Sequence, residues 1–167
     1  RDAETASIAV QAALTGHLVL STLHTNGSVS AISRLVDMKI EPFLLSSSLL
    51  AVLAQRLVRR LCLKCRKPKE AEAKESVAVG EALLPVGTPI FEAVGCEACH
   101  RSGYRGRIPI FELMRVDEWL HTAITERKSE VEMLAHLREH GFRTLREDGV
   151  RRIIEGLSSV DEVLRAT

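Results

Sequence analysis

The four cysteines of this 167-residue chain form two closely spaced pairs that are typical of a metal site. Cys62 and Cys65 lie in the stretch CLKC, and Cys96 and Cys99 lie in CEAC. Two residues between thiolates allow both sulfur atoms to face one tetrahedral metal ion. The 30 residues between the pairs exceed the interval of about 15–20 that is usual in zinc ribbons. We expect one structural zinc ion, with residues 67–88 forming an inserted polar loop.

Two disulfide bonds, or a redox-active CxxC pair, are the alternatives for these cysteines. The chain shows no secretion signal, and a reducing compartment argues against disulfides. Two matched pairs would be a coincidence in a redox site. Four thiolates already complete the coordination shell of zinc, so we expect the neighbouring His100 to be solvated rather than a ligand.

Polar side chains also gather at the end of a short apolar run in GHLVLSTLHTNGS, residues 16–28. The apolar run predicts a buried strand over residues 17–23, and His24 follows it directly. In an α/β layer, the C-terminal end of a parallel strand borders the ligand crevice. An imidazole there can donate a hydrogen bond to a phosphate oxygen. The alternative is a histidine that only ends the strand and bonds to the backbone.

The elements that position these residues alternate between helix and strand in the first sixty residues. Asp2 is a candidate cap for a helix over residues 3–14, which Gly16 would end. The stretch NGSVSAISRLVDM predicts a second helix. Pro42 suits the first turn of a third, which we expect to continue to residue 61. This order predicts the later part of an α/β layer.

The last sixty residues predict mainly helices that pack as a small bundle. Asp117 is a candidate helix cap, and three capping boxes follow it. The boxes pair Ser129 with Glu132, Thr144 with Glu147, and Ser159 with Glu162. Before these helices, GYRGRIPIFELM predicts a glycine-rich turn that enters a short strand.

Composition excludes several classes of function. The net charge of +1 provides no global attraction for nucleic acid, and 4% aromatic residues offer few stacking platforms. No apolar run approaches the roughly 20 residues that a membrane-spanning helix needs. The opening RDAETASIAV lacks an initiator methionine, so we expect the chain to be part of a larger protein.

Taken together, these motifs resemble the C-terminal part of the ATPases of type II secretion and type IV pilus assembly. The resemblance rests on RDAETASIAVQAALTGHLVLSTLHTN, IEPFLLSSSLLAVLAQRLVRRLC, GYRGRIPIFEL and the paired CxxC motifs. It implies an α/β fold that is the C-terminal portion of a RecA-like P-loop ATPase core, with a four-cysteine zinc subdomain and a helical C-terminal subdomain. The corresponding divisions are residues 1–60, 61–106 and 107–167. The stretch STLHT matches the His box of the family, which implies a catalytic role for His24 near the terminal phosphate.

The resemblance also implies ATP and Mg²⁺ as cofactors of the full-length parent, in addition to the structural Zn²⁺. The chain contains no G-x-x-x-x-G-K-[ST] loop, so this part alone is expected to be inactive. The implied parent is a cytoplasmic homo-hexamer at the inner face of the bacterial inner membrane. Its implied partners are inner-membrane secretion platform proteins and, through peripheral association, the membrane itself, with no nucleic acid. The alternative function is a free-standing zinc-ribbon module for protein interaction.

Overall fold

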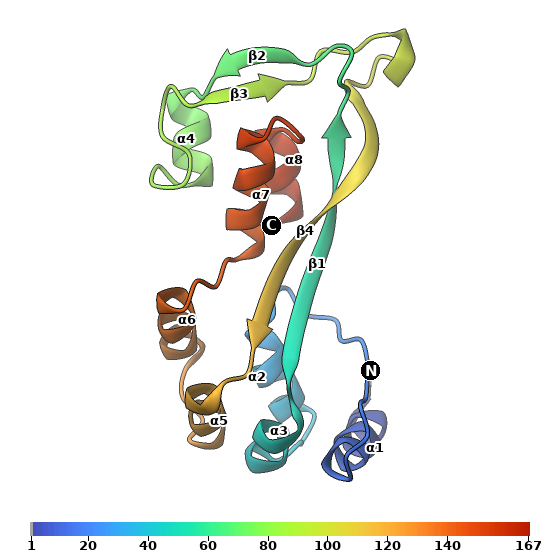
Figure 1. The fold of residues 1–167 in the computed structure, drawn as a ribbon, viewed down its shortest axis with the longest axis vertical. Helices are drawn as coiled ribbons and strands as arrows, with labels where there is room; N and C mark the ends of the chain where they lie inside the picture. The colour runs from blue at the N-terminus through green and yellow to red at the C-terminus, as the bar shows by residue number, and fades with distance from the viewer. Residues whose placement is uncertain (1) are drawn as a thin grey trace. The chain divides into compact units, whose positions relative to one another are not determined.

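The computed structural model describes residues 2–167 and divides the chain into two compact units. The first unit comprises Arg1–Ala54 and Glu112–Phe142, and the second comprises Gln55–Phe111 and Arg143–Thr167. Two long strands, β1 (Ala51–Leu61) and β4 (Tyr104–Arg115), pair in a two-stranded sheet (Figure 1). The division into residues 1–60, 61–106 and 107–167 stays a prediction. Among residues 2–167, no helix has the length and apolar character that crossing a bilayer requires.

The first unit is built mainly from short helices around an apolar core. Its helices are α1 (Ala3–Leu14), α2 (Ser30–Asp37), α3 (Pro42–Ser48), α5 (Glu118–Thr125) and α6 (Glu130–Glu139). Helix α3 packs against α1 and α5. The buried core draws residues from both chain segments, including Ile32, Leu45, Met114, Leu120 and Met133. Burial of these side chains joins residues 2–54 to 112–142.

The second unit combines a small antiparallel sheet with three helices. Strands β2 (Lys67–Glu70) and β3 (Pro89–Glu92) pair in a register that places Lys67 opposite Glu92. Helix α4 (Ala73–Val79) packs against α8 (Val160–Ala166), and α7 (Leu145–Ile154) packs against both β3 and α8. The short 3₁₀ helix η1 (Glu97–Cys99) lies within the second cysteine pair. The shared core contains Val79, Leu84, Ile90, Ile153 and Val163.

The predicted loop between the cysteine pairs is wrong, because this segment is folded. Residues 67–88 contain β2 and α4, and Leu84 is fully buried at 0% exposure. Glu72 and Glu75 form a capping box that begins α4. The segment therefore contributes to the core of the second unit, which a solvated insertion would not do.

The predicted long helix after Pro42 is also wrong beyond Ser48. Three consecutive serines end it, and the hydroxyls of Ser46 and Ser47 donate to the Phe43 carbonyl oxygen at 3.0 and 2.9 Å. Such bonds compete with the helical pattern of the backbone. In β1, exposure alternates along residues 51–58, which is the period of a strand. Residues 51–61 therefore form a strand that pairs with β4, although their apolar composition is also compatible with a helix.

The strand predicted over residues 17–23 is absent, and this segment is irregular. Leu18 and Leu20 are 77% and 88% exposed. A strand needs hydrogen-bonding neighbours, and no strand of residues 2–167 pairs with this segment. Its apolar side chains therefore lie outside the core.

The predicted helix starts are confirmed, with one difference in the hydrogen bonds. Asp2 and Asp117 cap α1 and α5, and the boxes that begin at Ser129 and Thr144 are both reciprocal. Ser159 caps α8, but the Glu162 carboxylate bonds to Arg59 instead. The four C-terminal helices divide between the two units, with α5 and α6 in the first and α7 and α8 in the second.

Candidate metal centre

The four cysteine sulfur atoms lie together in the second unit. Each Sγ lies within 4.8 Å of the other three, and all four thiols are free. Cys62 and Cys96 are separated by 3.9 Å between sulfur atoms, and Cys65 and Cys99 by 3.8 Å. A disulfide would require about 2.05 Å. The predicted clustering is confirmed, and no disulfide joins these cysteines.

The distances between the sulfur atoms fit a tetrahedral metal ion. A zinc–sulfur distance of about 2.3 Å places the corners of the tetrahedron about 3.8 Å apart. The Cys62–Cys96, Cys65–Cys99 and Cys96–Cys99 separations are 3.9, 3.8 and 3.8 Å. Four soft thiolates also form the donor set of structural zinc sites. The residues therefore fit a zinc ion by both spacing and chemistry.

Each cysteine pair is held by a tight backbone turn. In the first pair, the N–H groups of Cys65 and Arg66 donate to the Cys62 carbonyl oxygen at 3.2 and 2.9 Å. In the second pair, the N–H of Cys99 donates to the Cys96 carbonyl oxygen at 3.2 Å. The Cys62 N–H donates to the Gly103 carbonyl oxygen at 2.9 Å, which ties the first turn to the segment after the second. A backbone hydrogen bond between Cys62 and Gly103 therefore holds the two turns close together, in addition to the clustering of the sulfur atoms.

Backbone N–H groups also point at the sulfur atoms. The N–H groups of Cys96 and Gly103 donate to the Cys99 sulfur at 3.1 and 3.3 Å. The Cys96 bond, assisted by Gly103, lowers the pKa of Cys99 to about 6. Burial raises the pKa of Cys65 to about 12, although the Gly95 N–H donates to its sulfur at 3.3 Å. A bound zinc ion would hold both as thiolates.

Gly103 occupies a position that a larger residue cannot fill without a shift. Its φ is +78°, in the left-handed region. A Cβ there would lie 2.7 Å from the Ala93 Cβ and 3.2 Å from the Ala93 Cα. This close approach brings Gly103, which follows the second cysteine pair, against Ala93, which precedes that pair.

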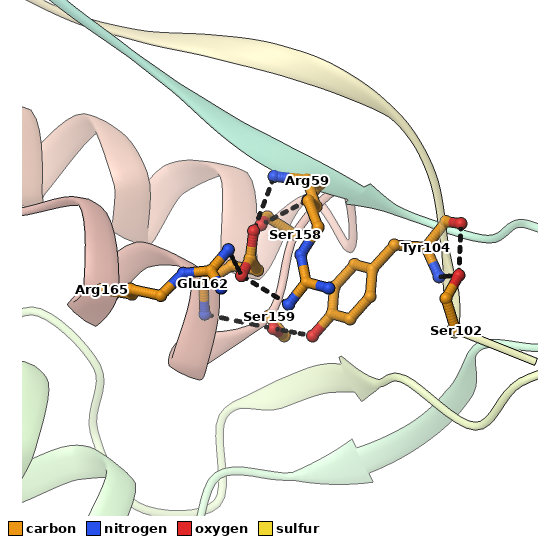
Figure 2. A network of polar contacts seen from close by, with 7 residues as sticks. All are labelled: Arg59, Ser102, Tyr104, Ser158, Ser159, Glu162 and Arg165. Carbon is orange, nitrogen blue, oxygen red and sulfur yellow. Dashed lines mark hydrogen bonds and ion pairs between the residues drawn. The ribbon is translucent and has the colours of Figure 1, made fainter.

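A partly buried polar network ties the strands near the cysteines to α8 (Figure 2). The Glu162 carboxylate accepts hydrogen bonds from the Arg59 backbone N–H at 2.9 Å and from Arg59 Nη2 at 2.7 Å. Arg165 also pairs with Glu162. Burial opposes ionisation of Glu162, but the bonds from Arg59 outweigh it and lower the pKa of this carboxyl. The carboxylate therefore stays charged at neutral pH.

Tyr104 extends the same network along β4. The Arg59 guanidinium carbon lies 4.0 Å from the centroid of the Tyr104 ring, and the Tyr104 hydroxyl lies 2.7 Å from Ser159 Oγ (Figure 2). The partners Glu162 and Ser158 lie 103 and 99 positions from Arg59 along the chain, so no local pattern could identify them.

The structure places the other candidate residue, His24, away from any helix or strand. Its side chain is exposed in the irregular segment between α1 and α2. His100 is exposed as expected, with a left-handed φ of 50°. His24 lies in the first unit and the cysteines in the second, so the two candidate sites belong to different units.

Sequence reasoning missed a buried carboxylate that contacts Ser28, four residues after His24. Glu112 on β4 is 7% exposed, and its Oε1 accepts hydrogen bonds from the backbone N–H and Oγ of Ser28, each at 2.6 Å. The pattern IFELM contains an acid among apolar residues, and this was the available signal.

Comparisons with known proteins agree with the motifs. A family model described as "Type II/IV secretion system protein" matches residues 1–165. The chain is 54% identical over 168 residues to a type II secretion system protein E of Pseudomonas aeruginosa. It is 50% identical over 167 residues to the type II secretion system ATPase E of Vibrio cholerae. It is 45% identical over 170 residues to the type IV pilus assembly ATPase PilB of Thermus thermophilus.

All of this chain is covered in these matches, but it spans only 33% of the length of each of the two type II relatives and 19% of PilB. A solved structure of the pilus retraction motor PilT with bound ADP covers all of the chain and 37% of the PilT chain, with a TM-score of 0.65 and 22% identity. That likeness shows a shared α/β fold. The family match over nearly the whole chain is decisive: the chain belongs to the type II/IV secretion system protein family.

Proposed function

We propose that this chain is the C-terminal part of an ATPase that powers type II protein secretion. The observation that carries the proposal is the family match over residues 1–165, together with 54% identity to a type II secretion system protein E. Identity to the pilus assembly ATPase PilB is lower, at 45%, which favours secretion over pilus assembly. Residues 1–60 would then belong to a RecA-like core whose P-loop lies in a preceding part of the protein.

His24 is the residue that we propose to act on the nucleotide. Its imidazole is exposed, so it is free to approach a ligand. An imidazole N–H can donate to an oxygen of the terminal phosphate, where charge changes during phosphoryl transfer. Mg²⁺, when bound with ATP, would neutralise the phosphate oxygens. The role of His24 would be to orient the terminal phosphate and stabilise its charge.

The metal in the second unit would be a structural zinc ion held by Cys62, Cys65, Cys96 and Cys99. The sulfur separations of 3.8–3.9 Å support this assignment. Four protein ligands leave no coordination position for a substrate, which favours a structural role over a catalytic one. The ion would fasten two turns that are separated by a folded segment.

The parent protein would act as a homo-hexamer in the cytoplasm, at the inner face of the bacterial inner membrane. Its partners would be inner-membrane proteins of the secretion platform, and it would associate with the membrane peripherally. The type II relatives support this setting through the secretion system in their names. No role in nucleic-acid binding is proposed.

The first experiment is to sequence the parent gene upstream of Arg1. A P-loop in that part supports the ATPase, whereas its absence favours a free-standing zinc-ribbon module. The second is to compare ATP hydrolysis by the full-length protein and by this chain alone. We expect turnover only from the full-length protein, because the phosphates need the loop and the Mg²⁺ site.

A further inference from the structure

The buried carboxylate of Glu112 stands out because a charge is rarely buried without compensation. Glu112 is 7% exposed on β4, and Ser28 is fully buried opposite it. The Ser28 backbone N–H and hydroxyl both donate to Glu112 Oε1 at 2.6 Å. Both contacts are short, so they hold Ser28 closely against the carboxylate. One oxygen atom therefore fixes both the backbone and the side chain of Ser28.

Ser28 lies in a compact polar turn that begins directly after His24. The Thr25 hydroxyl donates to the Gly27 carbonyl oxygen at 2.9 Å. The Ser30 hydroxyl donates to the same oxygen at 3.0 Å, and the Gly27 N–H donates back to Ser30 Oγ at 3.2 Å. A Cβ on Gly27 would lie 3.1 Å from Glu112 Oε1, so the turn passes close to the carboxylate. Residues 25–30 thus form a self-bonded turn that rests on Glu112.

The turn also leads into α2, whose start lacks a local cap. Val29 occupies the cap position, and it offers no hydrogen-bonding side chain. The N–H groups of Ala31 and Ile32 donate to the carbonyl oxygens of Ser28 and Val29 at 3.3 and 3.0 Å, so the first turn of the helix depends on where residues 28 and 29 lie. Glu112 therefore holds Ser28, which directly precedes the cap residue of α2, from a position 84 residues away.

On its other side His24 has no comparable anchor. Residues 16–22 are exposed and irregular, so the chain that leads to His24 is not packed on the core. Among the described contacts, those of the turn over residues 25–30 are the ones that can fix the backbone beside His24. The position of this turn depends on Glu112.

We propose that Glu112 is a positioning residue that holds this turn and thereby orients His24 toward the terminal phosphate of the nucleotide. The inference rests on the role proposed above for His24. Glu112 does not touch the phosphate in this proposal and acts only through the backbone of residues 25–30. A misplacement of about 1 Å in a catalytic group can reduce the rate by about 10²-fold.

Three substitutions in the full-length protein separate hydrogen bonding from charge. Glu112→Gln keeps an acceptor oxygen at the same distance from β4, Glu112→Asp withdraws it by one methylene, and Glu112→Ala removes it. We expect kcat to fall least for Gln, and to fall about 10- to 100-fold for Asp and Ala. KM for ATP should stay within about twofold, because the P-loop provides most of the ground-state binding. A kcat for Asp that equals or exceeds that for Gln overturns the proposal.

Glu130 provides a matched control in the same unit. Its Oε1 accepts a hydrogen bond from the hydroxyl of Ser33 on α2 at 2.6 Å, but this contact is exposed and does not involve residues 25–30. Glu130→Gln should leave kcat unchanged. Equal losses for Glu112→Ala and Glu130→Gln, measured per folded molecule, overturn the positioning role.

A double-mutant cycle distinguishes positioning from a general loss of stability. If Glu112 acts through His24, adding Glu112→Ala to His24→Ala should reduce kcat by less than twofold further. A full additional loss shows that Glu112 acts by another route. If the wild type hydrolyses ATP and His24→Ala does so equally well, the proposed role of His24 fails, and this inference fails with it. If His24→Ala is slow but Glu112→Ala is not, only the positioning role fails.

Amide hydrogen exchange on the full-length protein gives a readout without nucleotide. We expect the Ser28 amide to exchange at least tenfold faster in Glu112→Ala than in the wild type, and the Val150 amide of α7 to remain unchanged. An unchanged Ser28 rate means that the carboxylate does not hold the turn. Glu112→Asp, which withdraws the acceptor by one methylene, serves if the Ala variant does not fold.

Discussion

Replacing Gly103 by alanine tests whether the close approach beside the cysteines is required for the metal centre. Two costs are expected. The first is the left-handed backbone conformation, with φ of +78°, which costs an alanine about 1 kcal/mol. The second is overpacking, because the new Cβ would lie 2.7 Å from the Ala93 Cβ, and such clashes cost about 1–3 kcal/mol. The free energy of unfolding should therefore fall by about 2–4 kcal/mol.

Gly106→Ala measures the first cost alone. Its φ is +80°, nearly that of Gly103, but a Cβ there meets nothing within 4 Å. Gly106→Ala should therefore cost only about 1 kcal/mol, from the backbone conformation alone. The difference between the two variants measures the contact with Ala93.

The assay is urea unfolding of the zinc-loaded chain, with release of zinc to a colorimetric chelator followed in parallel. We expect Gly103→Ala to release zinc sooner than Gly106→Ala, because Gly103 also donates its N–H to the Cys99 sulfur and accepts from the Cys62 N–H. Equal losses of stability in the two variants would refute the argument, since the clash with Ala93 would then contribute nothing.

Three further predictions concern the metal, the buried network and pH. Cys65→Ser should reduce zinc from one ion per chain to a weakly held fraction in elemental analysis, and the helical circular dichroism of the second unit should fall with it. Glu162→Ala should cost about 2–4 kcal/mol in urea unfolding, because the buried carboxylate accepts charge-assisted bonds, whereas exposed Glu155→Ala should cost under about 1 kcal/mol. Burial opposes ionisation of Asp117, but hydrogen bonds from His136 and from the Leu120 backbone lower the pKa of this carboxyl in the folded state. Ionised Asp117 therefore stabilises the fold above the unfolded pKa of about 3.9, and this stabilisation is lost as pH falls through the folded pKa. The stability difference between the wild type and Asp117→Asn, followed by the fluorescence of the single tryptophan, should therefore shrink below about pH 4.

The features that the sequence predicted well depend on residues a few positions apart. Helix caps at Asp2, Asp117 and Ser129 bond to N–H groups three residues away, and each is present. The CxxC spacing is equally local, and it predicted the turn within each pair. That both pairs share one site was inferable because four thiolates complete one coordination shell.

The features that the sequence predicted poorly depend on distant partners. The apolar run after Ser48 is compatible with a helix or a strand, and pairing with β4 decides for the strand. The run at residues 17–23 has strand composition but no strand beside it within residues 2–167. The segment between the cysteine pairs is polar along the sequence, yet Leu84 is buried by α7 and α8 residues that follow much later. Local composition contained none of this information.

The stretch GYRGRIPIFELM, which suggested only a turn and a short strand, supports both candidate sites. Gly103 donates to the Cys99 sulfur and packs against Ala93, and Tyr104 bonds to the start of α8. Further along, Glu112 is buried among alternate inward-facing residues of β4 and holds the turn beside His24. The stretch supplies none of the groups proposed to bind metal or phosphate, so motif searches aimed at chemistry pass over it. A strand as such requires neither Gly103 nor Glu112. Gly103 is explained by its close approach to Ala93 within the second unit, and Glu112 by its hydrogen bonds to Ser28 within the first.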